Sequence, residues 1–459
     1  MKSLIQHNFF IALFLLFLTN GLNAKNIEVK ENLPLDQQLK LPNSTYVFKG
    51  KCRLSANFTI PPNCQLVFEG GMIEGPYTLT GTNSYINAAP YCIFSSEVAI
   101  RGTWINNICY AEWFGAIGDG VKDDREALQK ALDTKISVLE LLPKTYLIGS
   151  YSDVKNKVGL KVPTKKSIIG HAVDDWSQEY SLNAKKGVTF NVLLQITGVH
   201  VTIKGVGIFG ARSRDYNAYT VKDCIATLQD NYYTGLHLEY VFVSGCKENG
   251  INLYTYNTRL ENCYVTNCDV AYYIHGGNGQ GTSVHLLMCT AERARKNAYR
   301  IEKMSYSVLE VCAADHCALG TTTNTHGRGD EYGYNYYYFG CRGVSEISCG
   351  HEAGGYSHYF VNCRGMSIQT GRYTNSGLRN YMDWNDNMLK DMWVIKDSRD
   401  IEISQTTFAS PMLDGGKVMT IDHNSSNLKV VQGFYVNQNS RFESISAAHV
   451  AGYTDRIEF

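Results

Sequence analysis

Apolar and polar residues alternate in short segments through the C-terminal two-thirds of the chain, and these segments recur at regular intervals. Four clear copies are Leu236–Cys246, Thr258–Cys268, Ser283–Ala294 and Ser307–Cys317. Equivalent cysteine positions in these copies lie 22 to 26 residues apart. Short alternating segments between Asn, Gly and Asp turns are typical of β-strands, and such a period is typical of a solenoid. Because the copies lack the spacing of leucine-rich repeats, the pattern predicts an all-β parallel β-helix.

The cysteines of the repeats are expected to stack inside the solenoid as free thiols. Cys263, Cys289 and Cys312 each end an alternating apolar segment, so one small side chain per coil points inward. The chain has 14 cysteines but no Cys-x-x-Cys and no Cys/His group at zinc spacing, which argues against a structural zinc. The pairing of four cysteines nearer the N-terminus stays open: Cys52, Cys64, Cys92 and Cys109.

The N-terminus has the pattern of an export signal. Lys2 precedes the apolar run Phe9–Leu18, and small and polar residues follow up to Ala24. This order is typical of a secretory signal peptide, and the run is too short to span a membrane. We therefore expect residues 1–24 to be removed and the mature protein to have no transmembrane segment. Its expected location is the periplasm, the cell surface or the medium.

Composition narrows the classes of function. Lys+Arg and Asp+Glu are 43 each, so the formal net charge is zero and a general nucleic-acid binder is excluded. Hydrophobic residues make up 44% of the chain and charged residues 19%, which excludes a disordered protein. The 459 residues include 41 glycines, 9 prolines and 31 tyrosines, a balance that favours a β-rich fold with many turns.

The most specific segment is Ala111–Leu132, which reads AEWFGAIGDGVKDDREALQKAL. A Gly-Asp-Gly turn at 118–120 is followed by Asp123 and Asp124, either of which can cap a helix over Arg125–Leu132. This segment resembles the opening motif of the pectate-lyase-like superfamily. In that superfamily the pattern Phe-Gly-Ala-x-Gly-Asp-Gly-x-x-Asp-Asp, followed by an amphipathic helix, begins the solenoid.

The resemblance implies a single-stranded right-handed parallel β-helix over residues 111–459, capped at its start by the helix. A small β-rich segment at 25–110 would be either an accessory domain or the first turns of the solenoid. The chain also resembles secreted polysaccharide lyases of Bacteroidetes that act on uronic-acid polymers such as chondroitin and hyaluronan. Asp119, Asp123 and Asp124 are interpreted as structural caps rather than as a calcium or catalytic cluster.

Outward positions on neighbouring coils carry the candidate catalytic residues. Alternation along the strands places Tyr254, His275 and Arg300 on the outer surface of successive coils. β-Elimination from a uronic acid needs a cation to neutralise the carboxylate, a base for the C5 proton and a donor to the leaving oxygen. Arg300, His275 and Tyr254 match these tasks in that order. The alternatives are an exposed histidine, an ion pair of Arg300 with Glu302, and a plain aromatic ladder.

Further residues are expected to bind the substrate. Asn252, Tyr273 and Lys303 flank the catalytic positions on the same strands. The long polar segment Ala318–Phe339 is expected to project over the groove as a tyrosine-rich loop. It would supply three more substrate-binding residues: His326, Arg328 and Tyr336. His326 and Arg328 are also the alternative catalytic pair, should the site not lie at His275 and Arg300.

These features favour an endo-acting lyase for an acidic polysaccharide such as a glycosaminoglycan, because an open groove with a local basic stripe suits a long polyanion. A polygalacturonase-type glycoside hydrolase is the rival enzyme. It is disfavoured because the sequence shows no aspartate pair between Cys224 and His275, and hydrolysis needs two carboxylates. A tailspike-like glycan-binding protein is the non-enzymatic alternative. No cofactor is required, although calcium stays open, and we expect a monomer.

Overall fold

The structure, a computed structural model, describes residues 26–172, 179–213, 215–228, 233–318, 333–352, 354–374, 392–409, 417–436 and 442–459. Within these ranges the chain forms two compact units. Unit 1 comprises the residues up to 117 together with 126–140, and unit 2 comprises residues 118–125 and 141–459.

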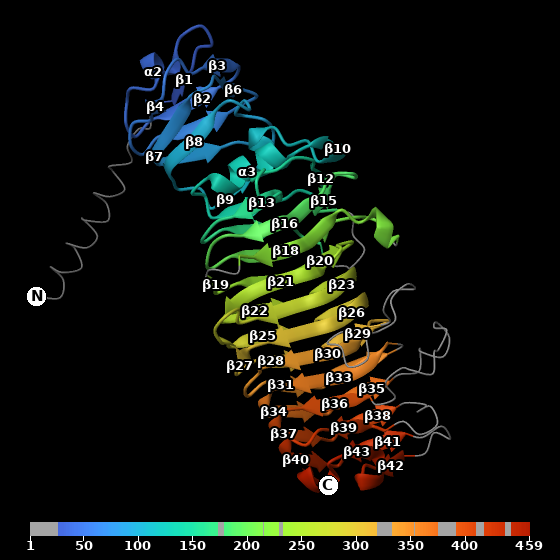
Figure 1. Ribbon diagram of the computed structural model, residues 1–459. Helices are drawn as coiled ribbons and strands as arrows, with labels where there is room; N and C mark the ends of the chain where they lie inside the picture. Colours follow the sequence, from blue (N-terminus) through green and yellow to red (C-terminus); the bar gives the residue numbers. More distant parts are fainter. Residues whose placement is uncertain are drawn as a thin grey trace, which may run out of the picture. The chain divides into compact units, whose positions relative to one another are not determined.

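Unit 1 is a small parallel β-structure with its own repeat. Strands β2, β5 and β7 place Thr45, Gln65 and Tyr85 side by side as Cα partners, so one coil takes 20 residues. The next residues along β2 and β5, Tyr46 and Leu66, point inward and are fully buried. The elements, blue to cyan in Figure 1, are β1 (Asn26–Glu28), α2 (Leu35–Gln38), β2 (Thr45–Phe48), β3 (Lys51–Arg53), β4 (Phe58–Thr59), β5 (Gln65–Phe68), β6 (Met72–Glu74), β7 (Thr78–Asn87), β8 (Ala99–Trp104), β9 (Ile108–Tyr110), η1 (Ala111–Phe114), α3 (Arg125–Asp133) and β11 (Val138–Glu140).

The predicted turn and helix around residue 120 are present. Asp123 Oδ1 accepts hydrogen bonds from the backbone N–H of Arg125 at 3.1 Å and of Gly149 at 2.8 Å. Asp124 Oδ2 accepts one from the N–H of Gly118 at 3.0 Å. Four apolar residues of α3 are buried as predicted: Ala127, Leu128, Ala131 and Leu132. These contacts support the structural interpretation of Asp123 and Asp124, whereas the role of the helix as a cap on the β-helix stays a prediction.

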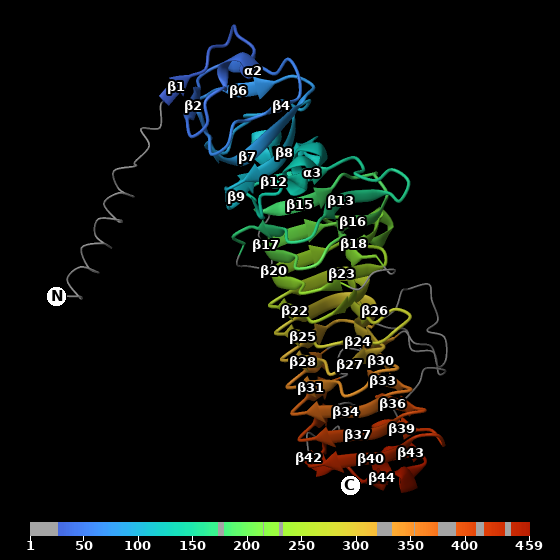
Figure 2. The same ribbon diagram turned by 90° about the vertical axis from the view of Figure 1, so that its left-hand side faces the viewer.

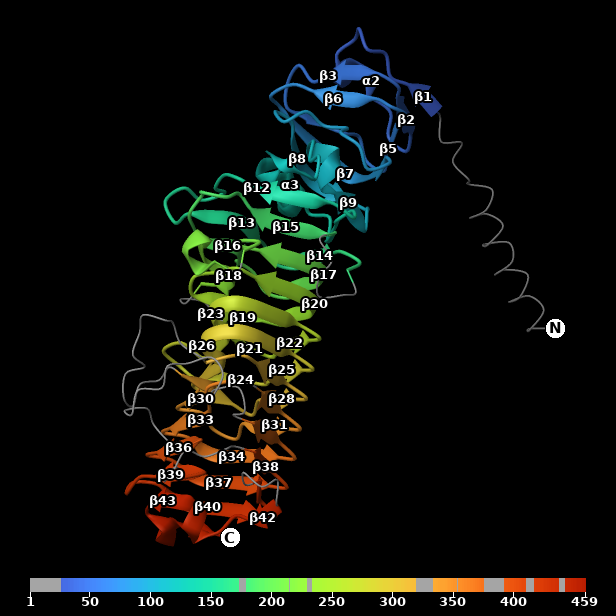
Figure 3. The same ribbon diagram turned by 90° about the vertical axis from the view of Figure 1, so that its right-hand side faces the viewer.

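Unit 2 is a parallel β-helix whose strands form one continuous series of pairings, and its described coils present three faces, named here faces A, B and C. Each coil runs from face C through face A to face B. Figure 2 shows strands of face C one above the next, and Figure 3 shows faces B and C side by side. The long strands β17, β20, β23 and β26 turn a corner and contribute to two faces each.

The three faces contain the following strands. Face A contains β10 (Asp119–Asp123), β12 (Thr145–Ile148), β15 (Ser181–Ala184), β17 (Thr202–Phe209), β20 (His237–Ser244), β23 (Tyr264–His275), β26 (Thr290–Glu302), β29 (Ala313–Asp315), β32 (Gly350–Glu352), β35 (Arg372–Thr374), β38 (Thr407–Ala409) and β41 (Phe434–Val436), followed by the antiparallel β42 (Phe442–Ser444). Face B contains β13 (Val158–Val162), β16 (Phe190–Ile196), β18 (Val221–Thr227), β21 (Asn249–Tyr256), β23, β26, β30 (Tyr334–Phe339), β33 (Tyr356–Val361), β36 (Trp393–Lys396), β39 (Met419–Ile421) and β43 (Val450–Gly452). Face C contains β14 (Ser167–Ile169), β17, β20, β22 (Thr258–Glu261), β25 (Val284–Leu287), β28 (Val308–Glu310), β31 (Ser345–Ile347), β34 (Arg364–Gln369), β37 (Arg399–Ser404), β40 (Ser426–Val431) and β44 (Ile457–Glu458). Three short strands and three 3-10 helices lie outside these series: β19 (Tyr233–Thr234), β24 (Gly281–Thr282), β27 (Met304–Ser305), η2 (Tyr216–Ala218), η3 (Ala447–His449) and η4 (Thr454–Arg456).

The cysteines of the repeats lie inside unit 2, as the sequence predicts. Cys263, Cys289 and Cys312 are at most 1% exposed. All 14 cysteines are free thiols, and this includes Cys52 and Cys64, whose pairing the sequence left open. The repeat register read from the sequence is therefore confirmed.

A stack of tyrosines crosses the interior opposite these cysteines. Tyr272, Tyr299 and Tyr336 point inward from face B, and successive ring centroids lie 5.0 and 5.1 Å apart. Their hydroxyls approach the backbone carbonyls of three cysteines at 2.8, 2.7 and 3.0 Å: Cys263, Cys289 and Cys312. Each tyrosine therefore ties its strand to a cysteine corner, which satisfies a polar group that burial would otherwise penalise.

One corner of unit 2 places a residue with left-handed backbone in each coil. The backbone N–H of this residue donates to a carbonyl of the next coil, so the conformation is imposed by the stacking. Asparagine adopts positive φ readily, whereas a β-branched residue there is strained. The corner positions include Asn262 (φ 51°), Met288 (φ 52°), Val311 (φ 53°), Ser348 (φ 53°) and Thr370 (φ 54°).

Replacing the strained Val311 by asparagine is expected to stabilise the protein. Val311 is 48% exposed, so the Val311→Asn substitution loses little packing and relieves about 1 kcal/mol of backbone strain. Urea unfolding should show a higher free energy of unfolding for this variant. The reverse change at the equivalent position, Asn262→Val, is the matched control and should lower it. A Val311→Asn protein less stable than the parent would contradict this account of the corner.

A charged cluster is buried in the interior further along the solenoid. Glu346 and His358 are both 0% exposed, and His358 Nε2 lies 2.9 Å from Glu346 Oε1. The hydroxyls of Tyr338 and Tyr373 also donate to this carboxylate. His351 is 2% exposed, and burial, followed by the nearby His358, lowers the pKa of His351 to about 3. His351 and His358 both lie inside the solenoid rather than on its outer surface.

The buried His351 predicts loss of stability in acid. The unfolded chain binds a proton on this histidine below pH about 6.5, whereas the folded chain stays neutral until the pH nears 3, so the free energy of unfolding falls as pH drops through that window. From this residue alone the loss between pH 7 and pH 5 is about 2 kcal/mol. His351→Phe should remove that part of the pH dependence in chemical unfolding curves. The matched control His423→Phe, at an exposed histidine, should keep the parental slope; equal slopes in all three proteins would be evidence against the assignment.

Candidate functional site

The outer surface of face B brings together most of the predicted site residues. Tyr254 of β21 is the direct Cα partner of His275 of β23, as the alternation predicts. Arg300 of β26 pairs with Tyr273 rather than with His275, and His275 pairs with Glu302. The register between β23 and β26 shifts by one residue after Cys268, which places Arg300 opposite the outward Tyr273 rather than opposite the inward Ile274.

His275 is a buried neutral imidazole rather than an exposed base. It is 4% exposed, and burial, followed by the charges of Arg300 and Lys303, lowers its pKa to about 4. Asn252 lies between His275 and Asp223: its Nδ2 donates to Asp223 Oδ2 at 2.9 Å, and its Oδ1 lies 3.0 Å from His275 Nε2. Because that Oδ1 only accepts, Nε2 carries the proton and Nδ1 carries the lone pair. Asn252, predicted to bind substrate, thus orients His275.

Tyrosine rings cover His275 on two sides. The Tyr273 ring stacks on the imidazole at 4.3 Å between centroids, and the Tyr254 ring at 5.7 Å. Tyr254 is itself 5% exposed, and a Cβ on Gly277 (φ +59°) would lie 2.7 Å from its ring. Lys303 Nζ donates to the carbonyl of Gly277 at 3.0 Å. The glycine-rich loop at 276–281, which follows His275, therefore packs against Tyr254.

Arg300 forms a half-buried ion pair with Glu302. The Nε and Nη2 atoms of Arg300 lie 2.7 and 2.5 Å from Glu302 Oε1, with side chains 12% and 15% exposed. Tyr273 donates its hydroxyl to Glu302 Oε2 at 2.9 Å. The guanidinium also lies over the rings of Tyr337 and Tyr273 at 4.7 and 5.5 Å from their centroids. The ion-pair alternative for Arg300 is therefore observed, in a more buried form than a surface pair.

The remaining predicted residues do not join this group. Tyr336 is 0% exposed and belongs to the interior stack, because alternation points it opposite to Tyr337. Its predicted contact with substrate is therefore wrong. His326 and Arg328 lie outside the described residues, so their predicted roles stay predictions.

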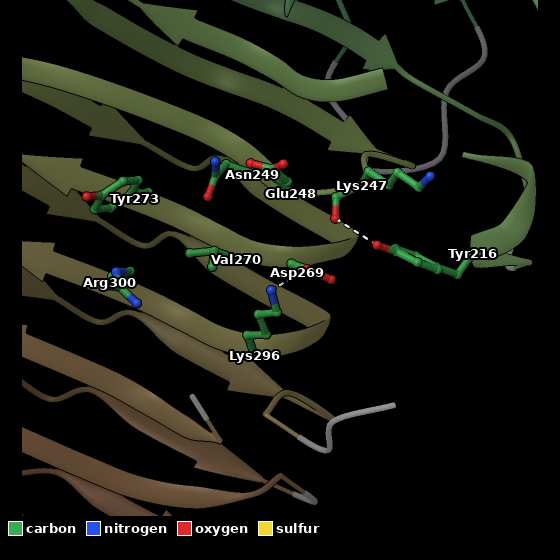
Figure 4. A pocket seen from close by; sticks show the side chains of 9 residues that line it. All are labelled: Tyr216, Lys247, Glu248, Asn249, Asp269, Val270, Tyr273, Lys296 and Arg300. Carbon is green, nitrogen blue, oxygen red and sulfur yellow. Dashed lines mark hydrogen bonds and ion pairs between the residues drawn. The ribbon is translucent and has the colours of Figure 1, made fainter. Parts of the chain in front are cut away.

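A pocket of about 470 Å³ opens beside this network (Figure 4). Tyr273 and Arg300 line it, together with seven residues that the sequence reasoning did not single out as site residues: Tyr216, Lys247, Glu248, Asn249, Asp269, Val270 and Lys296. Tyr216 lies in η2, and Lys247 and Glu248 lie in the turn before β21. The others lie on β21, β23 and β26. Of these, only Lys296 had a sequence signal, as part of the basic segment Glu292–Lys303.

The pocket has an excess of positive charge. Asp269 is 5% exposed and pairs with Lys296 at 2.9 Å and also with Arg295. Glu248 pairs with Lys222 at 3.1 Å. Lys247 makes no ion pair with any residue in the described ranges, so its ammonium charge is not compensated by the protein there. Two tyrosine rings and an uncompensated lysine suit an acidic sugar.

The pocket also corrects one sequence argument. Hydrolysis was disfavoured because no aspartate pair was found near these coils. The structure brings Glu248 and Asp269, which are 21 residues apart, into the lining of a single pocket. Carboxylates on neighbouring coils do not need a paired sequence motif, because the stacking of coils supplies the proximity.

Comparisons with known proteins agree on the fold. No family model matches the chain, and no curated protein matches it. The DFA-IIIase of Arthrobacter chlorophenolicus A6 has a TM-score of 0.54 and 10% identity, over 77% of this chain and 93% of that one. The enzymatically active domain of tailspike protein 2 from bacteriophage CBA120 has a TM-score of 0.50 and 11% identity, over 76% and 52%. The gp42 tailspike of Acinetobacter phage vb_AbaP_AS12 has a TM-score of 0.48 and 10% identity, over 75% and 65%.

The two likenesses with a TM-score of at least 0.50 agree with the parallel β-helix fold of unit 2. The chain spans between about half and two-thirds of the two tailspike chains. No helix in the described ranges is long and apolar enough to cross a membrane. The finer resemblance to Bacteroidetes lyases and the signal peptide stay predictions.

The Arg300–Glu302 pair predicts a large effect of neutralising one partner. Glu302→Gln leaves the mostly buried guanidinium without this counter-charge and should lower the free energy of unfolding by about 3 kcal/mol. The double variant Glu302→Gln/Arg300→Met removes both charges and should be more stable than Glu302→Gln alone. Urea unfolding of the parent, Glu302→Gln, Arg300→Met and the double variant completes the cycle. A Glu302→Gln protein as stable as the parent would show that the pair carries no net coupling.

Proposed function

We propose that this protein is an enzyme acting on an acidic polysaccharide, with its active site in the face B pocket. The observation that carries the proposal is the lining itself: two tyrosines, three cations and two carboxylates around about 470 Å³. Aromatic rings pack against sugar rings, and the surplus cation attracts a carboxylate or sulfate group. That two structural neighbours are described as an enzyme and an enzymatically active domain supports catalysis rather than binding alone.

The finer proposal is β-elimination across a uronic acid, as in a glycosaminoglycan lyase. Lys247 neutralises the substrate carboxylate, since the Arg300 guanidinium is committed to Glu302. Tyr273 and Glu302 form the proton-accepting pair: the C5 proton passes to Tyr273 Oη while the hydroxyl proton passes to Glu302 Oε2, 2.9 Å away. The C4–O bond then breaks, a C4–C5 double bond forms, and water protonates the leaving oxygen while the proton on Glu302 returns to the hydroxide so formed, which restores the carboxylate. The imidazole of His275 stacks on the Tyr273 ring and holds the ring in position.

Hydrolysis is the second candidate, favoured by Glu248 and Asp269 in the same pocket. An acid and a base on either side of a glycosidic bond would cleave it without creating a double bond. The two reactions differ in their products, because only elimination leaves an unsaturated uronate that absorbs in the near ultraviolet.

The test is incubation of the full chain with a panel of chondroitin, dermatan, hyaluronan, pectin and ulvan. Unsaturated product is expected from at least one polymer, and Tyr273→Phe should lower kcat by about a hundredfold. Lys247→Ala should lower kcat as well as raise KM, because the charge that neutralises the carboxylate and stabilises the developing enolate is lost. Lys429→Ala, an exposed lysine of face C, is the matched control and should behave as the parent.

Each other outcome contradicts part of the proposal. New reducing ends without unsaturated product would replace elimination by hydrolysis. Full activity of Tyr273→Phe would show that Tyr273 and Glu302 are not the proton-accepting pair. If no polymer of the panel is cleaved or bound, the proposed class of substrate is wrong.

A further inference from the structure

A second hollow lies on unit 1, entirely within its 20-residue coils. It has a volume of about 590 Å³ and is lined by Asn63, Cys64, Gln65, Asn83, Tyr85 and Ile105. Gln65 and Tyr85 are Cα partners on β5 and β7, and Asn63 and Asn83 occupy the preceding turns of the same two coils. The hollow therefore repeats the same position from one coil to the next.

The asparagines of this surface have a structural reason, but the apolar residues do not. Asn63 (φ 58°) and Asn83 (φ 50°) adopt the left-handed conformation that these turns require. Asn63 Nδ2 also donates to Asn43 Oδ1 at 3.0 Å on the preceding coil. Tyr85 is 39% exposed and Ile105 is 61% exposed, so neither side chain supports the interior. Exposed aromatic and aliphatic side chains within a polar hollow indicate a binding surface.

The chemistry of the lining selects the ligand. None of the six side chains carries a charge at neutral pH, which distinguishes the hollow from the cationic pocket of unit 2. Within the ranges that the structure describes, the Gln65 amide and the Tyr85 hydroxyl have no hydrogen-bond partner in the protein. An aromatic ring and an aliphatic side chain offer a surface for the C–H face of a sugar ring, and the amides offer donors and acceptors for hydroxyls.

We propose that unit 1 carries a second glycan-binding site, selective for an uncharged polysaccharide. Tyr85 and Ile105 pack against the sugar rings, and Gln65 and Asn83 bind their hydroxyl groups. A polymer lying across successive coils meets the same position of the repeat at each step, Gln65 on one coil and Tyr85 on the next. The proposal does not rest on the reaction assigned to unit 2, and a second copy of the chain or another protein is the competing occupant.

The test is affinity electrophoresis of the full chain in native gels that contain β-glucan, mannan, xylan or arabinan. At least one polymer is expected to retard the parent protein, and Tyr85→Ala should raise the apparent dissociation constant by about tenfold. Tyr85→Phe keeps the ring and should retain most of the binding. The matched control Tyr306→Ala, at a 78% exposed tyrosine of unit 2, should be retarded like the parent.

Thermal unfolding of each variant shows whether the fold is kept, and Ile105→Ala, at a 61% exposed position of the hollow, should also weaken retardation and keeps the test decisive if Tyr85→Ala unfolds. Unretarded migration of the parent in every gel would overturn the proposal, and so would equal retardation of the parent and Tyr85→Ala. If gel filtration shows a parental dimer that Tyr85→Ala converts to a monomer, the hollow is a protein interface instead. Loss of cleavage by unit 2 variants with unchanged retardation would leave this site standing while the proposed reaction fails.

Discussion

The parallel hydrogen bonding between successive coils is the constraint on which the rest of unit 2 depends. Each coil must place its strands in register with the coils on both sides, so an inward position is filled by similar side chains again and again. Cysteine follows cysteine at one corner and tyrosine follows tyrosine across the interior. A polar hydroxyl is acceptable there because the facing carbonyls recur with the same period.

The same register builds the site on the opposite surface of the same strands. Because Tyr272 and Tyr299 point inward, their neighbours Tyr273 and Arg300 must point outward and lie side by side. The outer network then depends on close ion pairing and ring stacking, with Glu302 joining both residues. A cation held in this way contributes rigidity to the pocket, whereas an uncompensated cation such as Lys247 remains able to attract an anion.

The sequence predicted the parts of this arrangement that depend on alternation. The inward cysteines, the buried face of α3 and the pairing of Tyr254 with His275 all follow from which side of a strand a residue faces. The register of Arg300 could not be predicted, because it depends on a bulge whose position no alternation reveals. Lys247 and Asp269 lie near turns, where periodicity ends, so only the stacking of coils shows that they share a pocket.

The cysteine stack also affects how this chain tolerates oxidants. Burial raises the pKa of the Cys246 and Cys317 thiols, so they do not form the thiolate that reacts with peroxides or disulfides. That protection exists only once the coils have closed over the sulfur atoms, and a nascent chain exposes every thiol. If the coils close faster than the thiols oxidise, the interior stays reduced and unreactive. If folding is slower than oxidation, disulfides can form between coils before the coils have stacked. In an oxidising compartment, the speed of coil closure would then determine the yield of native protein.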